Sequence, residues 1–87
     1  MLTVTAIPVA HSVALSWKTG AAHVVSYSLY RSTISGPSYG LTASAIGGIA
    51  YSDQSVQSAT TYYYVLTAID YQDRESTYSS EIRAMIP

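Results

Sequence analysis

Hydrophobic and polar residues alternate along most of this 87-residue chain, and the period of the alternation is two. The clearest example lies at residues 13–18, where Val13, Leu15 and Trp17 are separated by small or polar residues. This period is typical of a β-strand with one buried face, whereas a helix would show a period of about 3.6. The pattern predicts seven strands, at residues 2–6, 13–18, 27–30, 39–46, 49–52, 61–69 and 81–86.

Short strands separated by turn residues favour an antiparallel arrangement, because parallel strands need long crossover connections. Pro8 is expected to end the first strand, and Ser35-Gly36-Pro37 separates the third strand from the fourth. Gly47-Gly48 is expected to form a hairpin turn before the fifth strand. The expected fold class is therefore all-β, with two antiparallel sheets packed face to face as a sandwich.

The segment before the sixth strand carries a second signal. Val56 lies six positions before Tyr62, and the residues between them are small or polar. In sandwich folds a tyrosine in such a place bonds through its hydroxyl to the upstream backbone, where the chain crosses between sheets. We therefore expect Tyr62 to be a corner tyrosine.

Four segments resemble a fibronectin type III domain of the kind found in secreted bacterial multidomain proteins. They are Ser12-Val13-Ala14-Leu15-Ser16-Trp17, Tyr27-Ser28-Leu29-Tyr30-Arg31-Ser32, the strand from Thr61 to Asp70, and Glu75-Ser76-Thr77-Tyr78-Ser79. The resemblance covers essentially the whole chain. It implies a seven-stranded antiparallel immunoglobulin-like β-sandwich, in which the first, second and fifth strands pack on the third, fourth, sixth and seventh.

The resemblance also implies a particular core. Its members would be Trp17 packed against Tyr27, Leu29, Tyr64 and Leu66, with Tyr62 at the corner. One position departs from the family pattern, because Ser58 stands where a proline is usual. The backbone of the corner turn is therefore less restricted than proline would make it.

Composition and charge narrow the classes of function. The formal net charge is −1 and the chain has no basic cluster, which argues against nucleic acid, whose binding depends on neutralising phosphates. No apolar run approaches the roughly 20 residues of a membrane span, so no membrane insertion is expected. The chain has no cysteine, and its two histidines cannot form a structural zinc site by themselves.

The expected strands reach close to both ends of the sequence. The first begins at Leu2, and the last apolar position is Ile86, followed by Pro87. We expect residues 1–87 to be a single fibronectin type III-like domain excised from a larger extracellular protein. Its first partners would then be the neighbouring domains of the parent chain.

A catalytic site is not expected. A Ser/His/Asp arrangement needs three side chains within hydrogen-bond reach of one another. His11 and His23 are expected in turns at opposite ends of the sandwich, where both would be ordinary solvent-facing residues. Gly47-Gly48 alone does not make a phosphate loop. The chain is expected to have no catalytic residue, to need no cofactor, and not to be an enzyme.

One acidic cluster resembles a cation site at first sight. Asp70, Asp73 and Glu75 could suggest calcium, which takes about six to eight oxygen ligands. Arg74 lies inside the cluster, and the spacing matches no recognisable ligand loop. A solvated loop is the better interpretation, and no metal residue is assigned.

The nine tyrosines offer a candidate binding face. Tyr30 and Tyr63 have the phase opposite to the core positions, so they should lie on the outer face of the third, sixth and seventh strands. Val65 should join them, and Tyr39 should border the patch. Tyrosines are favoured at binding surfaces, because they give rigid amphipathic contact area. Alternatively, such residues only form cross-strand pairs that stabilise the sheet.

The loops offer a second candidate site. The turn from Thr19 to Val25, the Gly47-Gly48 turn and the segment from Tyr71 to Thr77 should cluster at one end of the sandwich. The candidate binding residues there are His23, Tyr71, Asp73 and Arg74. The loop lacks an Arg-Gly-Asp sequence, so an adhesion role of that type has no support.

Three functional hypotheses follow. The chain is a non-catalytic spacer or accessory module, for example beside a polysaccharide-degrading domain. Alternatively it binds carbohydrate or protein through the tyrosine-bearing face or the loop end. In the third hypothesis it is a self-associating subunit, because low charge and exposed strand edges let copies pair.

Overall fold

The computed structural model describes residues 3–18, 24–36 and 38–87. Seven strands lie within these residues and alternate with turns and loops. They are β1 (Thr3–Val9), β2 (Ser12–Lys18), β3 (Val24–Ser32), β4 (Gly40–Ile46), β5 (Ala50–Asp53), β6 (Thr61–Asp70) and β7 (Ile82–Met85).

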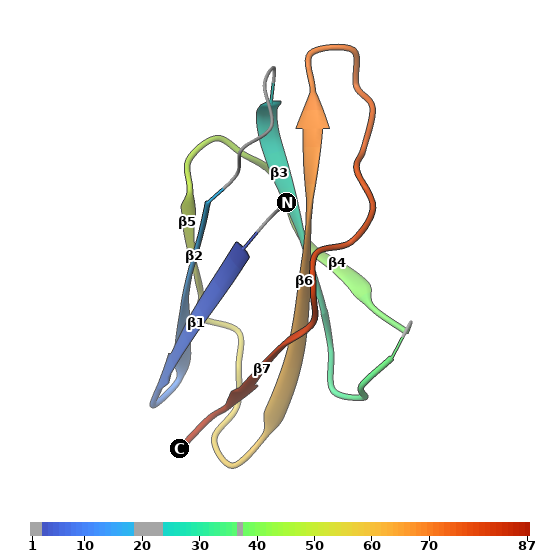
Figure 1. Cartoon of the computed structure of the whole chain (residues 1–87). Helices are drawn as coiled ribbons and strands as arrows, with labels where there is room; N and C mark the ends of the chain where they lie inside the picture. Colours follow the sequence, from blue (N-terminus) through green and yellow to red (C-terminus); the bar gives the residue numbers. More distant parts are fainter. Residues whose placement is uncertain (1–2, 19–23, 37) are drawn as a thin grey trace.

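The strands form two antiparallel sheets that pack against each other (Figure 1). One sheet has the order β1-β2-β5 and the other the order β4-β3-β6-β7. The expected all-β sandwich is therefore confirmed, and so is the division of strands that the family resemblance implied. Within the described residues, no helix is long and apolar enough to cross a membrane.

Strand β1 continues through Pro8, so the prediction that this proline ends the strand is wrong. Pro8 pairs with Val13 of β2. The N–H of Trp17 donates to Ile49 O at 3.0 Å, on the β5 side of β2. Because backbone groups alternate in direction along a strand, Val13 also directs its N–H away from β1. The nitrogen of Pro8 consequently faces the open edge of the sheet, where the ladder loses no hydrogen bond.

The Gly47-Gly48 turn does not form a hairpin, and this prediction is also wrong. β4 belongs to the four-stranded sheet, whereas β5 pairs with β2 in the other sheet. The connection therefore crosses from one layer to the other (Figure 1). A pair of glycines predicts a change of direction, but it does not determine which strand pairs with the next segment.

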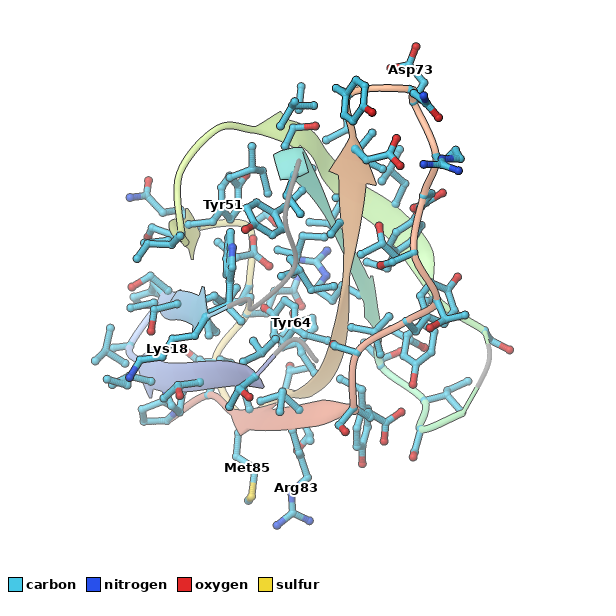
Figure 2. The ribbon with its side chains drawn as sticks, turned by 45° about the horizontal axis from the view of Figure 1, so that its top comes forward. Lys18, Tyr51, Tyr64, Asp73, Arg83 and Met85 are labelled. Carbon is cyan, nitrogen blue, oxygen red and sulfur yellow. The ribbon has the colours of Figure 1, made fainter. Side chains whose placement is uncertain are left out.

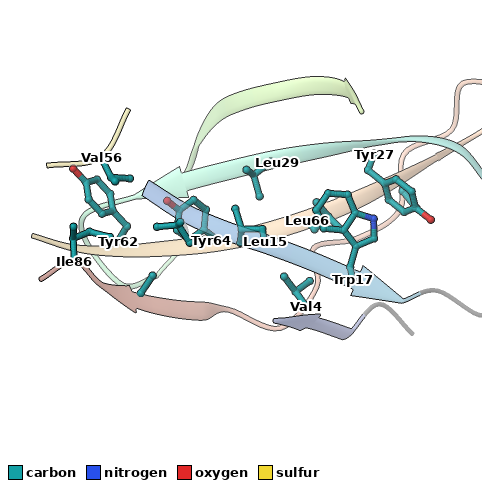
Figure 3. Packing of buried hydrophobic residues seen from close by; sticks show 13 residues of the cluster. Val4, Leu15, Trp17, Tyr27, Leu29, Val56, Tyr62, Tyr64, Leu66 and Ile86 are labelled. Atoms are coloured by element: carbon teal, nitrogen blue, oxygen red, sulfur yellow. The ribbon is translucent and has the colours of Figure 1, made fainter. Parts of the chain in front are cut away.

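The space between the sheets is filled by the inward-facing residues of both layers. Trp17 is 2% exposed, and its ring meets that of Tyr27 edge-on, with centroids 5.3 Å apart and planes inclined at 61°. Figure 3 shows Trp17 and Tyr27 at one end of the core and Tyr62, Val56 and Ile86 at the other, with Tyr64 between Leu15 and Tyr62. The indole therefore closes one end of the core and does not form its centre.

The corner before β6 is held by Tyr62. The Gln57 N–H donates to the hydroxyl oxygen of this buried tyrosine at 2.9 Å. The turn is also tied to the end of the chain, because the Ala59 N–H donates to Ile86 O and the Ile86 N–H donates to Thr60 O. Ala59 adopts a left-handed conformation with φ of 57°.

Candidate functional site

The outer face of the β4-β3-β6-β7 sheet carries Tyr30 and Tyr63, as the alternation predicts. Tyr30 lies opposite Val65 across β3 and β6, and Tyr63 lies opposite Arg83 across β6 and β7. Figure 2 shows the side chain of Arg83, on β7, extending away from the molecule. Both tyrosines are partly exposed.

Val65 is not available for binding, so its place in the expected face is corrected. The residue is only 2% exposed. It lies in the central strand β6. Tyr30 of β3 lies opposite it on one side of this strand, and the segment that contains Ser76 and Ser79 runs along the other side. Thr67, two positions further on the same face, is buried as well. The middle of β6 is therefore covered on both faces, which the alternation of residue types did not indicate.

Tyr78 connects two of the expected face residues. Its ring meets the ring of Tyr30 edge-on, with centroids 5.2 Å apart and planes inclined at 62°. It meets the ring of Tyr39 in the same way, at 5.4 Å and 80°. Tyr78 is 48% exposed, whereas Tyr30 and Tyr39 are less so.

The position of Tyr78 follows from how the irregular segment after β6 is attached. The N–H groups of Ser76 and Ser79 donate to Ala68 O and Leu66 O, at 2.9 and 2.8 Å. In return, the N–H groups of Ala68 and Leu66 donate to the hydroxyl oxygens of the same two serines, each at 2.9 Å. Serine side chains thus replace strand carbonyls as acceptors, and the segment runs beside β6 (Figure 1).

Two glutamates complete this part of the surface. Glu75 Oε2 accepts hydrogen bonds from the hydroxyls of Tyr30 and Thr67, the latter at 2.6 Å. Glu81 Oε2 accepts a hydrogen bond from the hydroxyl of Tyr39. We call the set Tyr30, Tyr39, Tyr78, Glu75 and Glu81 the tyrosine face.

Glu81 is held by a second segment of the chain as well. Ser35 Oγ donates to Glu81 Oε1 at 2.7 Å, and the Gly36 N–H donates to Oε2 at 3.1 Å. Gly36 has φ of 119°, a conformation that residues with a Cβ rarely adopt. The β3–β4 turn is therefore shaped so that its backbone reaches the carboxylate.

The hydrogen bonds of the tyrosine face keep its two glutamates charged and keep Tyr30 and Tyr39 neutral. The bonds from Thr67 and Tyr30 lower the pKa of Glu75, and the bonds from Tyr39, Ser35 and Gly36 lower the pKa of Glu81. Burial and the bond to Glu81 raise the pKa of Tyr39 to about 12. The bond to Glu75 raises the pKa of Tyr30.

A surface hollow lies beside two of these rings. It is lined by Tyr30, Thr67, Glu75, Ser76, Thr77 and Tyr78. Its lining therefore combines two aromatic rings, several hydroxyl groups and one carboxylate. Neither Lys nor Arg is among these lining residues.

Of the expected loop residues, Tyr71, Asp73 and Arg74 lie in the turn after β6, and none of these three lines the hollow. Tyr71 is exposed, and Asp73, at φ of 62°, forms the tip of the β6–β7 turn (Figure 2). Arg74 Nε pairs with Asp70 Oδ2 at 2.8 Å, and Asp70 Oδ1 accepts the N–H groups of Gln72 and Arg74. These bonds stabilise the turn. His23 lies outside the described residues.

A buried charged network, which sequence analysis did not anticipate, joins the two sheets. Asp53, at the end of β5, is 2% exposed. Its Oδ2 accepts hydrogen bonds from Arg31 Nη1 and the Tyr64 hydroxyl, both at 2.8 Å, and its Oδ1 accepts the N–H and hydroxyl of Ser55. The Arg31 guanidinium carbon lies 4.9 Å from the centre of the Tyr62 ring, within range of a cation–π contact.

These partners decide the ionisation of Asp53. Burial by itself raises the pKa of the carboxyl group, but the hydrogen bonds from Ser55, Tyr64 and Arg31 outweigh it, so the pKa is lowered. Burial and the bond to Asp53 raise the pKa of Tyr64. The network is fully occupied with holding β3, β5 and β6 together, and we assign it a structural role.

The other candidates for chemistry lie apart. His11 is exposed in the β1–β2 turn at φ of 69°. Glu75, a member of the acidic cluster in the sequence, turns to Tyr30 and Thr67 instead of toward Asp70. Within residues 3–18, 24–36 and 38–87, no group of three or more His, Asp or Glu could hold a metal ion.

Sequence reasoning missed Tyr78 because it lies outside the predicted strands, and it missed Glu81 because the partners of this residue are more than 40 residues away in the sequence. Tyr78 lies in an irregular segment, and the partners of Glu81 are at positions 35, 36 and 39. A usable signal was the isolated aromatic residue in a stretch of Ser and Thr.

Comparisons with known proteins find the chain similar to part of one long protein. No family model matches the chain. It is 40% identical over 70 residues to an amylopullulanase of Thermoanaerobacter thermohydrosulfuricus, a match that covers 80% of this chain but only 5% of that relative.

Two solved structures resemble the fold closely. An Fn3-like protein from Clostridium thermocellum has a TM-score of 0.85 at 31% identity, covering 98% of this chain and 88% of that one. A β-1,2-glucanase from Parabacteroides distasonis has a TM-score of 0.80 at 26% identity, covering 93% of this chain and 12% of that one. The same sandwich therefore occurs both as most of one short chain and as a small part of a longer one.

Proposed function

Because the chain belongs to the fibronectin type III family, we propose that it is a non-catalytic module of a larger extracellular bacterial protein that acts on polysaccharide. The observation that carries the proposal is the match to the amylopullulanase, in which most of this chain corresponds to 5% of a much longer protein. The similarity to part of a β-1,2-glucanase points to the same class of parent protein.

The physical features of the chain suit a spacer or stabilising module. Its buried carboxylate, that of Asp53, is bound by Arg31, Tyr64 and Ser55 and so ties the two sheets together. The molecule is elongated, with extents of 39 × 23 × 18 Å. A stiff sandwich of this shape keeps neighbouring domains at a defined separation, whereas a flexible linker would let them approach.

The proposal is tested on the protein made by the source cells. An antibody raised against this chain is used to isolate the native polypeptide, whose mass and hydrolase activity are measured. We expect a polypeptide much longer than 87 residues that degrades a polysaccharide. Deleting the module should leave turnover of a short soluble substrate intact but lower the melting temperature of the remaining protein. A native polypeptide without a polysaccharide-active domain would contradict the proposal.

A further inference from the structure

We propose that the tyrosine face is a binding site for neutral polysaccharide, and that Tyr78 is its principal contact residue. This inference rests on the proposed function, since it names the ligand class that the module would recognise for its parent protein. Four properties of the site support it: the ring geometry, the hydrogen-bond acceptors, the charge and the hollow.

The three rings form an angled surface. Tyr78 stands edge-on to both Tyr30 and Tyr39, with planes inclined at 62° and 80°. Edge-to-face contacts are favourable for aromatic pairs, so they hold the rings in place before any ligand arrives. A pyranose ring has an apolar face of C–H groups, which packs on an aromatic ring. The exposed ring of Tyr78 offers such a surface, and little side-chain freedom is lost on binding, because its neighbours already orient it.

The glutamates supply fixed acceptors for sugar hydroxyls. Both hydrogen bonds from Tyr30 and Thr67 go to Oε2 of Glu75, and Oε1 accepts from neither of them. That oxygen belongs to a carboxylate whose orientation is already set. A hydroxyl-rich ligand in the hollow can donate to it, and hydrogen bonds to a charged acceptor are stronger than neutral ones.

The charge of the site selects among carbohydrates. Glu75 and Glu81 are held in their charged form, and the lining of the hollow includes no Lys or Arg. A uronate, phosphate or sulfate group in the hollow would lie beside the carboxylate of Glu75, with no Lys or Arg in the lining to pair with it. A neutral chain meets acceptors and aromatic carbon only, so the site favours neutral glucans over acidic polysaccharides such as polygalacturonate.

The hollow gives the ligand a defined place. Thr67 and Tyr30 lie on the sheet, whereas Glu75, Ser76, Thr77 and Tyr78 belong to the segment beside it. Concave sites lined by aromatic residues with a few oriented polar groups are the usual form of small-ligand sites. The hydroxyl of Thr77 adds a polar group to this lining, whereas that of Ser76 is engaged by Ala68 N and Thr77 O.

The test is affinity electrophoresis and titration calorimetry of the whole chain with three polymers: amylopectin, mixed-linkage β-glucan and polygalacturonate. We expect at least one of the neutral glucans to bind and polygalacturonate to bind at least tenfold more weakly. The variant Tyr78→Ala should lower the association constant at least tenfold. Tyr71→Ala is the matched control, because Tyr71 is also an exposed tyrosine but lies outside the face, and it should change the constant less than twofold.

A second measurement covers the case in which Tyr78→Ala does not fold. Titration of the unmodified protein, followed by amide NMR shifts, should show the largest changes at residues 75–78 and little change at residues 71–73. The inference is overturned if neither neutral glucan binds, if polygalacturonate binds as tightly, if Tyr78→Ala binds normally, or if the shifts appear elsewhere. The proposed function survives those results, since it depends on the parent polypeptide. Conversely, glucan binding with no polysaccharide-active parent would contradict the proposed function alone.

Discussion

Asp53 is a buried carboxylate, and two of its partners, Arg31 and Tyr64, come from other strands and not from neighbouring residues in the sequence. A carboxylate that is 2% exposed would be strongly destabilising without partners, because removing a charge from water is costly. Here its two oxygens accept hydrogen bonds from Arg31, Tyr64 and Ser55. The chain therefore places an ion pair between its sheets where β5 ends, with the carboxylate buried and the guanidinium partly exposed.

The lowered pKa of Asp53 makes the stability of the protein depend on pH. A carboxyl group with a lowered pKa in the folded state contributes fully above its unfolded pKa of about 3.9. That contribution is lost as the pH falls through the folded value. We expect the free energy of unfolding to decline below about pH 4, and the decline to be weaker in Asp53→Asn.

The Asp53→Asn variant should also be less stable at neutral pH, by roughly 1.5–3 kcal/mol, because hydrogen bonds to a charged group are lost. Urea unfolding followed by circular dichroism between pH 3 and 7 measures both effects, the range bracketing the ordinary carboxyl pKa of about 3.9. Asp73→Asn, at the exposed turn, serves as the control. An identical pH profile for Asp53→Asn and the unmodified protein would rule out the ionised network.

Tyr62 gives a second prediction for a single residue. Replacing Tyr62 by Phe removes the acceptor of the Gln57 N–H and keeps the buried ring. We expect a loss of about 1–2 kcal/mol, because one hydrogen bond disappears and a backbone donor loses its partner. The urea midpoint measures the loss, and Tyr63→Phe on the outer face should change it by less than about 0.5 kcal/mol. Equal effects of the two substitutions would remove the corner role.

Strands β6 and β1 differ in how their backbone N–H groups outside the regular strand pairing are treated: those of β6 find acceptors, whereas β1 has a proline without an N–H. β6 is central, and serine hydroxyls of the following segment complete its hydrogen bonding. β1 is an edge strand, and its outer edge carries the nitrogen of Pro8, which has no hydrogen to donate. Proline at such a position makes edge-to-edge pairing between copies less favourable.

The edge position of Pro8 predicts that the protein is monomeric. Analytical ultracentrifugation of the unmodified protein should give a single species with the mass of one chain. Pro8→Thr restores the missing donor and keeps a residue suited to strands, so this variant should associate more strongly at the same concentration. A self-associating unmodified protein would instead favour the hypothesis of a structural subunit.

For the molecule as a whole, stability depends on a small shared core. A domain of this length is expected to have about 4–13 kcal/mol of stability, from ~0.05–0.15 kcal/mol per residue. Replacing Trp17 by Ala should cost about 3–5 kcal/mol, because a buried ring is lost and a cavity remains beside Tyr27. Most or all of the folded population should then disappear well below the urea midpoint of the unmodified protein.

The same residue allows a direct check of the sandwich. Since Trp17 is 2% exposed, iodide should quench native tryptophan fluorescence only weakly and that of urea-unfolded protein strongly. Equal quenching in both states would be incompatible with two sheets closed around the indole. The loss of stability in Trp17→Phe should be smaller than in Trp17→Ala, because a smaller cavity remains.

The alternation of residues such as Val13, Leu15 and Trp17 was sufficient to predict the strands, the two-layer fold and the inner face of each sheet. Side-chain direction in a strand is a local property with a period of two, so the sequence carries it explicitly. Pro8 and Gly47-Gly48 were misread, because an edge position and a crossing between sheets depend on which strands pair.

The Asp53 network was decided by tertiary structure alone, and so were the contacts that join Tyr30 and Tyr39 to Tyr78, Glu75 and Glu81. Tyr30 contacts Tyr78 and Glu75, and Arg31 contacts Asp53. These residues are 22 to 48 positions apart in the sequence, and no spacing pattern predicts that they meet. Val65 has the phase of an exposed residue but lies in a covered central strand. Burial on an outer face depends on what a distant segment covers, and only the folded chain brings that segment into place.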